Sequence, residues 1–109
     1  MGYEYAIIHK DEAYDRLLRD LADCFAQQGP CHPVNFDGRA IWIDDPDPVN
    51  KGWKILEIYE DTAQRIEYLM PAGFRYLYCL LSGREQNAYL AMIEEILKRH
   101  GDGYFLEEL

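Results

Sequence analysis

The sequence predicts an α+β fold in which two main amphipathic helices pack on one face of a four- to five-stranded mixed or antiparallel sheet. Three observations carry this prediction. Apolar residues recur at helical spacing in two segments, β-branched and aromatic residues gather in short runs elsewhere, and glycine and proline separate these elements. A length of 109 residues is typical of one domain, so we expect residues 1–109 to form a single α+β domain.

The first half of the chain begins with a predicted strand and the clearest predicted helix. Residues Tyr3 to Ile8 are β-branched or aromatic, and the polar pair His9-Lys10 is expected to end this strand. From Asp11 to Gln28 the apolar residues recur every three or four positions, which predicts a helix capped by Asp11 and ended by Gly29-Pro30. The stripe consists of Tyr14, Leu17, Leu18, Leu21, Ala22 and Phe25.

The middle of the chain predicts a strand on either side of a polar connection. Pro30 to Gly38 is expected to be a loop, and Arg39 to Asp44 a strand with Ile41 and Ile43 on one face and Trp42 on the other. The prolines between Asp44 and Gly52 exclude helix and central strand there.

Residues Trp53 to Met70 allow two interpretations. They fit one long helix, or a strand from Trp53 to Glu60 that pairs with the preceding strand, followed by a short helix from Asp61 to Met70. We favour the hairpin.

The last third of the chain predicts a central strand, a second helix and an edge strand. Aromatic residues alternate in Phe74 to Leu81, as expected for a strand. Ser82 and Glu85 have the spacing of a capping box, which predicts that Ser82 caps the second helix. Gly101 should end that helix, and Tyr104 to Leu109 is expected to add an edge strand or an extended segment. The predicted buried side of the helix consists of Tyr89, Met92, Ile93, Ile96 and Leu97.

The resulting order is β-α-β-β-(short α)-β-α-β, which is ferredoxin-like in general type. This order implies that both main helices pack on the same face of the sheet.

The charge balance restricts the classes of partner. Twenty acidic residues against eleven Lys and Arg give a net charge of -9, which disfavours direct binding to nucleic acid or to an anionic membrane surface. No apolar run is long enough to cross a membrane, and the N-terminal residues do not form a signal peptide, so we expect a cytoplasmic protein. The odd set Cys24, Cys31 and Cys79 lacks CxxC spacing and predicts free thiols.

Motifs for catalysis, metals and cofactors are weak. Asp44, Asp45 and Asp47 are closely spaced, but a calcium loop starting at Asp45 would place Val49 and Leu56 at ligand positions, so we expect no metal. Adjacent Cys31 and His32 lack the further ligands that zinc needs, and are expected to be a loop thiol beside an exposed imidazole. Ser82 is the only serine and is assigned to the helix cap rather than to catalysis. We therefore expect no catalytic residues and no cofactor.

The strongest functional signal is an acidic loop between two tryptophans. Trp and Tyr anchor protein interfaces while charges steer the encounter, so we predict that this segment binds a partner through Trp42, Asp44, Asp45, Asp47, Trp53 and Glu57. The alternative is that both indoles are core residues of the hairpin. From Asp37 to Asp61 seven acids stand against three bases, a balance of -4 in that segment.

Three function classes follow from these residues, of which one is a structural subunit of a larger assembly that uses the sheet edge or the C-terminal segment for pairing. The favoured hypothesis is a small non-enzymatic inhibitor, of the immunity-protein, antitoxin or anti-CRISPR type, that docks on a basic protein partner. The alternative is a small oligomeric ligand-binding domain or enzyme with a pocket between sheet and helices, lined by tyrosines, His32 or Cys31. A homo-oligomer is compatible with either hypothesis.

Overall fold

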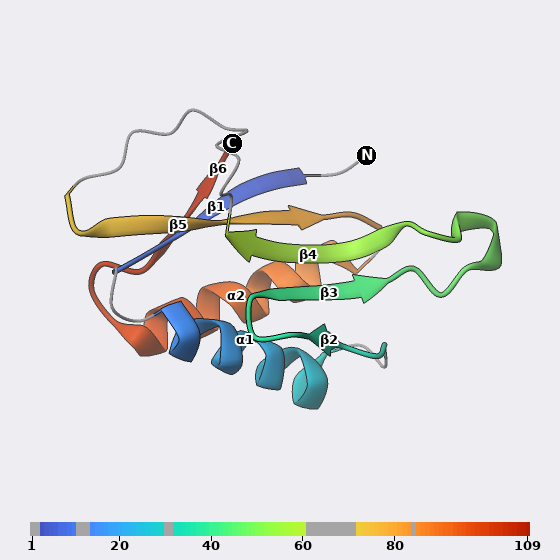
Figure 1. Ribbon diagram of the computed structural model, residues 1–109, viewed down its shortest axis with the longest axis horizontal. Coiled ribbons are helices and arrows are strands. Elements are labelled where there is room, and N and C mark those ends of the chain that lie inside the picture. The colour runs from blue at the N-terminus through green and yellow to red at the C-terminus, as the bar shows by residue number, and fades with distance from the viewer. Residues whose placement is uncertain (1–2, 11–13, 30–31, 61–71, 84) are drawn as a thin grey trace.

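The computed structural model describes residues 3–10, 14–29, 32–60, 72–83 and 85–109. Together they form an α+β fold with two helices and a six-stranded sheet (Figure 1). The strands are β1 (Tyr3–Lys10), β2 (Asn35–Phe36), β3 (Ala40–Asp44), β4 (Lys54–Glu60), β5 (Phe74–Leu81) and β6 (Phe105–Glu108). The helices are α1 (Tyr14–Gln28), α2 (Gln86–His100) and the short 3-10 helix η2 (Pro48–Asn50).

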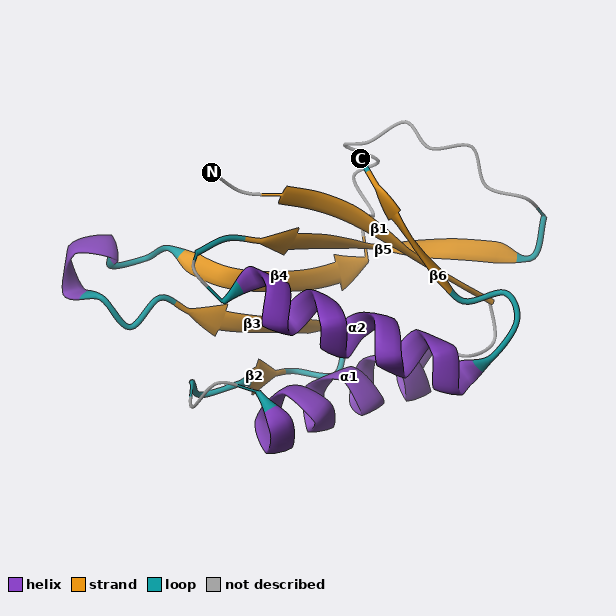
Figure 2. Cartoon of the chain, turned by 180° about the vertical axis from the view of Figure 1, so that it is seen from behind, coloured by secondary structure: helices purple, strands orange, loops and turns teal. Residues whose placement is uncertain are grey.

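The sheet has the order β2-β3-β4-β5-β1-β6, and every neighbouring pair is antiparallel. Strand β1 therefore lies between β5 and β6, with Tyr3 paired to Leu81 and Lys10 to Phe74. Both helices lie side by side on one face of this sheet (Figure 2). The opposite side of the sheet, on which neither helix lies, is called the open face below, although Ala6 and Ile8 of β1 are buried on it.

The core is built between the helices and the sheet. Residues of α1 and α2 pack against alternate residues of the strands, such as Ile7 of β1, Ile41 and Ile43 of β3 and Leu77 of β5. Burial of these apolar side chains is the main stabilising contribution to a fold of this size. In β1 the intervening residues Ala6 and Ile8 are also buried, so this strand is buried on both faces.

Several predicted elements are confirmed. The favoured hairpin is present, since Ile41 of β3 pairs with Ile58 of β4. Ile41 and Ile43 are fully buried while Trp42 is half-buried, as the alternation predicted. The second strand of the hairpin begins at Lys54 rather than Trp53. The capping role of Asp11 and the short helix from Asp61 to Met70 fall outside the described residues.

The sheet has one strand more than the highest predicted count, because β2 lies in the segment predicted to be a loop. Asn35 and Phe36 pair with Trp42 and Ile41 of β3. The connecting turn is stabilised by Asp37, whose carboxylate accepts hydrogen bonds from the backbone N–H groups of Arg39 and Ala40 at 2.9 and 2.8 Å. These hydrogen bonds lower the pKa of Asp37.

The prediction that Ser82 caps the second helix is wrong. Helix α2 begins at Gln86, and its N-cap residue Glu85 makes no side-chain capping hydrogen bond. The Ser82 hydroxyl instead donates to the carbonyl of Lys54 at 2.9 Å, and its backbone N–H donates to Ile55 at 3.0 Å. Ser82 therefore joins the end of β5 to the start of β4.

His9 also differs from the prediction. It belongs to β1 rather than to the polar end of that strand, and only 1% of its surface is exposed. Its Nδ1–H donates to the carbonyl of Lys10 at 2.9 Å, which satisfies one ring nitrogen inside the protein.

Candidate protein interface

The connection between β3 and β4 is a loop whose shape is fixed by its own acidic residues. The Asp45 carboxylate accepts hydrogen bonds from the Asp47 N–H at 2.9 Å and from the Asn50 side-chain amide at 3.1 Å. The Asp47 carboxylate accepts from the Val49 N–H at 3.0 Å and caps η2. The Asp45 N–H donates to the Trp53 carbonyl at 3.0 Å and closes the loop. Asx turns of this kind reduce the number of conformations open to the loop.

This loop exposes two large apolar side chains. Val49 is 89% exposed and Trp53 is 69% exposed, so Trp53 is not a core residue. Gly52, with a φ of 88°, provides the left-handed backbone conformation just before Trp53. Figure 1 shows the loop extending beyond the ends of β3 and β4, away from both helices. Trp53 is therefore presented to solvent on an ordered, acidic support.

The other predicted residues lie on the β3–β4 hairpin itself. Trp42 stands directly opposite Glu57 in the strand register. Because Ile41 and Ile43 face the core, Trp42 and Asp44 lie on the open face, and Asp44 is exposed. The structure therefore places Trp42, Asp44 and Glu57 on the open face, and Asp45, Asp47 and Trp53 in the adjoining loop. Their role in binding a partner stays a prediction.

The open face continues from Glu57 into residues that were not predicted as site residues. Tyr59 pairs with Tyr78 across β4 and β5, and the two rings have their centroids 5.3 Å apart. Burial, and a hydrogen bond that its hydroxyl donates to Glu4, raise the pKa of Tyr78. The alternating aromatics of β5 were visible in the sequence, but the register that joins them to Glu57 and Glu4 comes only from the strand pairing.

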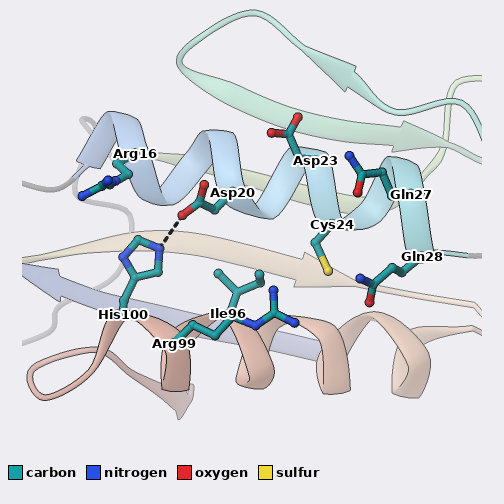
Figure 3. A pocket seen from close by; sticks show the side chains of 9 residues that line it. All are labelled: Arg16, Asp20, Asp23, Cys24, Gln27, Gln28, Ile96, Arg99 and His100. Carbon is teal, nitrogen blue, oxygen red and sulfur yellow. Dashed lines mark hydrogen bonds and ion pairs between the residues drawn. The ribbon is translucent and has the colours of Figure 1, made fainter.

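A separate groove lies between α1 and α2. It has a volume of about 520 Å³, and Arg16, Asp20, Arg99 and His100 are among the side chains that line it (Figure 3). His100 Nε2 lies 2.8 Å from Asp20 Oδ2 and joins the two helices. The groove lies between the helices, whereas the sequence predicted a pocket between sheet and helices.

The cysteines of the described residues do not have the properties of catalytic nucleophiles. Cys24 lines the groove and Cys79 is fully buried; both are free thiols, as predicted. Burial raises the pKa of both thiols, although Arg99 opposes this effect at Cys24, so neither is an activated nucleophile. Cys31 lies outside the described residues.

His32 is not the exposed imidazole that the sequence predicted. Its side chain is 19% exposed, and its Nε2 lies 2.5 Å from Glu85 Oε2. Glu85 immediately precedes α2, and His32 follows α1. This contact therefore joins the segment after α1 to the residue before α2, at one end of the helix pair. The contact between His100 and Asp20 joins the two helices nearer the other end.

Within the described ranges, no three His, Cys, Asp or Glu side chains are grouped so that they could hold a metal ion. None of the described helices is long and apolar enough to cross a membrane.

Comparison of the chain with protein-family models, with curated proteins and with solved structures finds no match.

Proposed function

We propose that this protein is a small acidic, non-enzymatic inhibitor of the immunity-protein, antitoxin or anti-CRISPR type, which docks on a basic protein partner through the β3–β4 hairpin and its loop. The single observation that carries the proposal is the exposure of Trp53, 69%, in a loop held by hydrogen bonds to Asp45 and Asp47. An indole is costly to leave in water and is enriched among the residues that dominate binding energy.

Burial of the Trp53 side chain by a partner would contribute enough binding free energy for Trp53 to be an anchor residue of the interface. A tryptophan buries 150–250 Å² when it is fully covered, so covering the exposed part of Trp53 would contribute about 3 to 4 kcal/mol at 25 cal/mol per Å². The loop needs little further ordering on binding, since its backbone is already hydrogen-bonded. Preorganisation of this kind increases the share of contact energy that appears as affinity.

The charge of the same segment supports a basic partner. The chain carries a net charge of -9, of which -4 lies between Asp37 and Asp61, the segment that contains the hairpin and its loop. An acidic surface around an apolar anchor raises the association rate with a basic protein and loses that advantage as salt increases.

Two further parts of this proposal concern the fold type and the cellular location. The adjacent strands β6-β1-β5-β4, with α1 following β1 and α2 following β5, support a ferredoxin-like general type for the fold, extended at one edge by β3 and β2. The free thiols Cys24 and Cys79 are compatible with a reducing compartment, which supports a cytoplasmic location.

The test is capture of the partner by the tagged full-length chain from a lysate of the organism that encodes it. We expect one basic protein, bound in a stoichiometric ratio at low salt, with an association rate that falls as salt rises. Trp53→Ala should abolish capture without changing the melting temperature. Phe105→Ala is the matched control, because Phe105 is an aromatic residue, 43% exposed, on β6 at the opposite edge of the sheet.

A charge reversal tests the electrostatic part separately. Asp44→Lys should slow association, because Asp44 is exposed on the open face and has no hydrogen bond or ion pair among the described residues. It is preferable to a change at Asp47, whose carboxylate also caps η2. Capture that survives both Trp53→Ala and Asp44→Lys would contradict the proposal.

The ligand-binding alternative has one observation in its favour, the groove between α1 and α2. If no partner is captured and a metabolite raises the melting temperature, that alternative replaces the proposal. Arg99→Ala should then remove the shift, because the Arg99 side chain lines the groove.

A further inference from the structure

We infer that Glu57 and the aromatic residues around it on the open face bind the guanidinium group of an arginine side chain of the partner. The inference rests on the proposed function, since it names the group on the basic partner that this surface would take. It is carried by the strand register, by the lack of a partner for the Glu57 carboxylate among the described residues, and by the kind of side chains that surround it.

The strand register surrounds Glu57 with apolar and aromatic residues. Trp42 stands opposite it on β3 and Leu80 opposite it on β5, each one strand away, a spacing of about 4.8 Å. Tyr59 lies two residues further along the same strand and on the same face. Tyr78, which pairs with Tyr59, occupies the diagonal position. The carboxylate therefore lies among two direct neighbours, Trp42 and Leu80, and two tyrosines.

Glu57 is half-buried and has no hydrogen bond or ion pair within the described part of the chain. Two other acids on the surface are paired: Glu60 contacts Arg75 at 3.4 Å, and Glu95 contacts Arg99 at 3.7 Å. Lys54 lies opposite Asp44 near the start of β4 and forms no ion pair with Glu57. A partly desolvated, unpaired carboxylate gains more from an incoming cation than a solvated one does.

The flanking side chains favour a guanidinium over an ammonium. A guanidinium is planar, donates two parallel hydrogen bonds to one carboxylate and stacks on aromatic faces. It is also more weakly hydrated than an ammonium, so that covering it costs less. Trp42 and the Tyr59–Tyr78 pair provide aromatic surface beside Glu57, and Leu80 provides an apolar surface for the alkyl part of the arginine.

Glu4 extends the acidic character of the site across the sheet. It pairs with Leu80 from the β1 side, so Leu80 separates Glu4 from Glu57. The carboxylate of Glu4 already accepts the Tyr78 hydroxyl. Glu57 has no such contact among the described residues, so its carboxylate remains available to bind the cation.

The test is a titration of the ¹⁵N-labelled full chain with N-acetyl-arginine methylamide, followed by NMR. The protein has two tryptophans, so Trp42 and Trp53 give two indole N–H signals that serve as site and internal reference. We expect the Trp42 signal to shift saturably, with a dissociation constant in the millimolar range, while the Trp53 signal stays in place. N-acetyl-lysine methylamide should bind about threefold more weakly.

Glu57→Gln should weaken binding of the arginine probe about tenfold, which corresponds to about 1.4 kcal/mol. Glu94→Gln is the matched control, since it makes the same chemical change at an exposed position on α2 and should leave binding unchanged. The two-dimensional spectrum of each variant also reports whether the fold is retained. If Glu57→Gln does not fold, Trp42→Leu takes its place and should weaken arginine binding in the same direction.

Three outcomes would overturn the inference: no saturable shift at Trp42, binding that Glu57→Gln or its substitute leaves unchanged, or a lysine probe that binds as tightly as arginine. None of them affects the proposed function, which depends on capture of a partner through Trp53. Conversely, arginine binding at Glu57 together with failure to capture a partner would contradict the proposed function but would still support an arginine-binding site at Glu57.

Discussion

Replacing Tyr89 by phenylalanine should stabilise the protein, although it removes a polar group from a well-packed helix. Tyr89 of α2 is 1% exposed and packs edge-on against Phe25 of α1, with ring centroids 5.5 Å apart. Its hydroxyl is buried and has no hydrogen-bond partner among the described residues. A buried hydroxyl without a partner costs about 1 to 3 kcal/mol, so its removal should raise the free energy of unfolding by about 1 to 2 kcal/mol.

The assay is urea denaturation at neutral pH, with the melting temperature as a second measurement. A gain of 1 kcal/mol corresponds to about 4 °C in a domain of this size. Tyr78→Phe is the matched control with the opposite expected sign, because the Tyr78 hydroxyl donates to Glu4 and its loss should cost about 1 kcal/mol. A loss of stability in Tyr89→Phe equal to that in Tyr78→Phe would refute the reasoning, since it would mean that the Tyr89 hydroxyl is hydrogen-bonded.

Three further predictions concern the fold. Leu18→Ala should lower the free energy of unfolding by about 2 to 5 kcal/mol, because Leu18 is fully buried in the core, and Leu18→Asp should give an unfolded chain by far-UV circular dichroism. Ser82→Ala should lower the free energy of unfolding by about 1 kcal/mol, while amide hydrogen exchange at the start of α2 stays unchanged. Faster exchange there would indicate that Ser82 caps α2 after all. Burial raises the pKa of Tyr89 to about 12, so between pH 10 and 12 the unfolded chain loses this proton while the folded chain keeps it. Stability should therefore fall over that range, and Tyr89→Phe should flatten the fall in pH-dependent urea titrations.

The sequence was sufficient for elements whose pattern is local. The stripe of α1 and the alternation of β5 depend on neighbouring residues, and both elements are present as predicted. β2 was missed because two residues are too few for an alternating pattern. A signal for it existed in Asp37-Gly38, a dipeptide typical of hairpin turns, and Gly38 has the positive φ of 91° that such a turn requires.

The capping box failed because its spacing cannot distinguish a helix start from a strand end. Ser82 and Glu85 fit the motif, but Ser82 lies directly after β5, where the carbonyl of Lys54 is within reach of its hydroxyl. His9 failed for a related reason. A polar residue was taken as the end of a strand, whereas β1 pairs with β5 beyond His9, as far as Lys10.

The candidate site was predictable only in part. Trp53 and its flanking acids are adjacent in sequence, so the exposed loop could be inferred from composition alone. The surroundings of Glu57 could not, because Leu80, Tyr78 and Glu4 reach it from β5 and β1 through strand pairing. Register is set by the packing of the entire sheet, which no local pattern contains.

The position of β1 between β5 and β6 has a consequence for how the chain reaches this structure. β1 is buried on both faces, but its two neighbours, β5 and β6, belong to the last third of the sequence. As the chain leaves the ribosome, Ala6, Ile7 and Ile8 therefore have no partner strand until β5 has been made. Long-range pairing of this kind slows folding, and it leaves an apolar strand open to association with other chains in the meantime. β1, whose Ala6, Ile7 and Ile8 are buried in the folded protein, is therefore exposed to such association during synthesis.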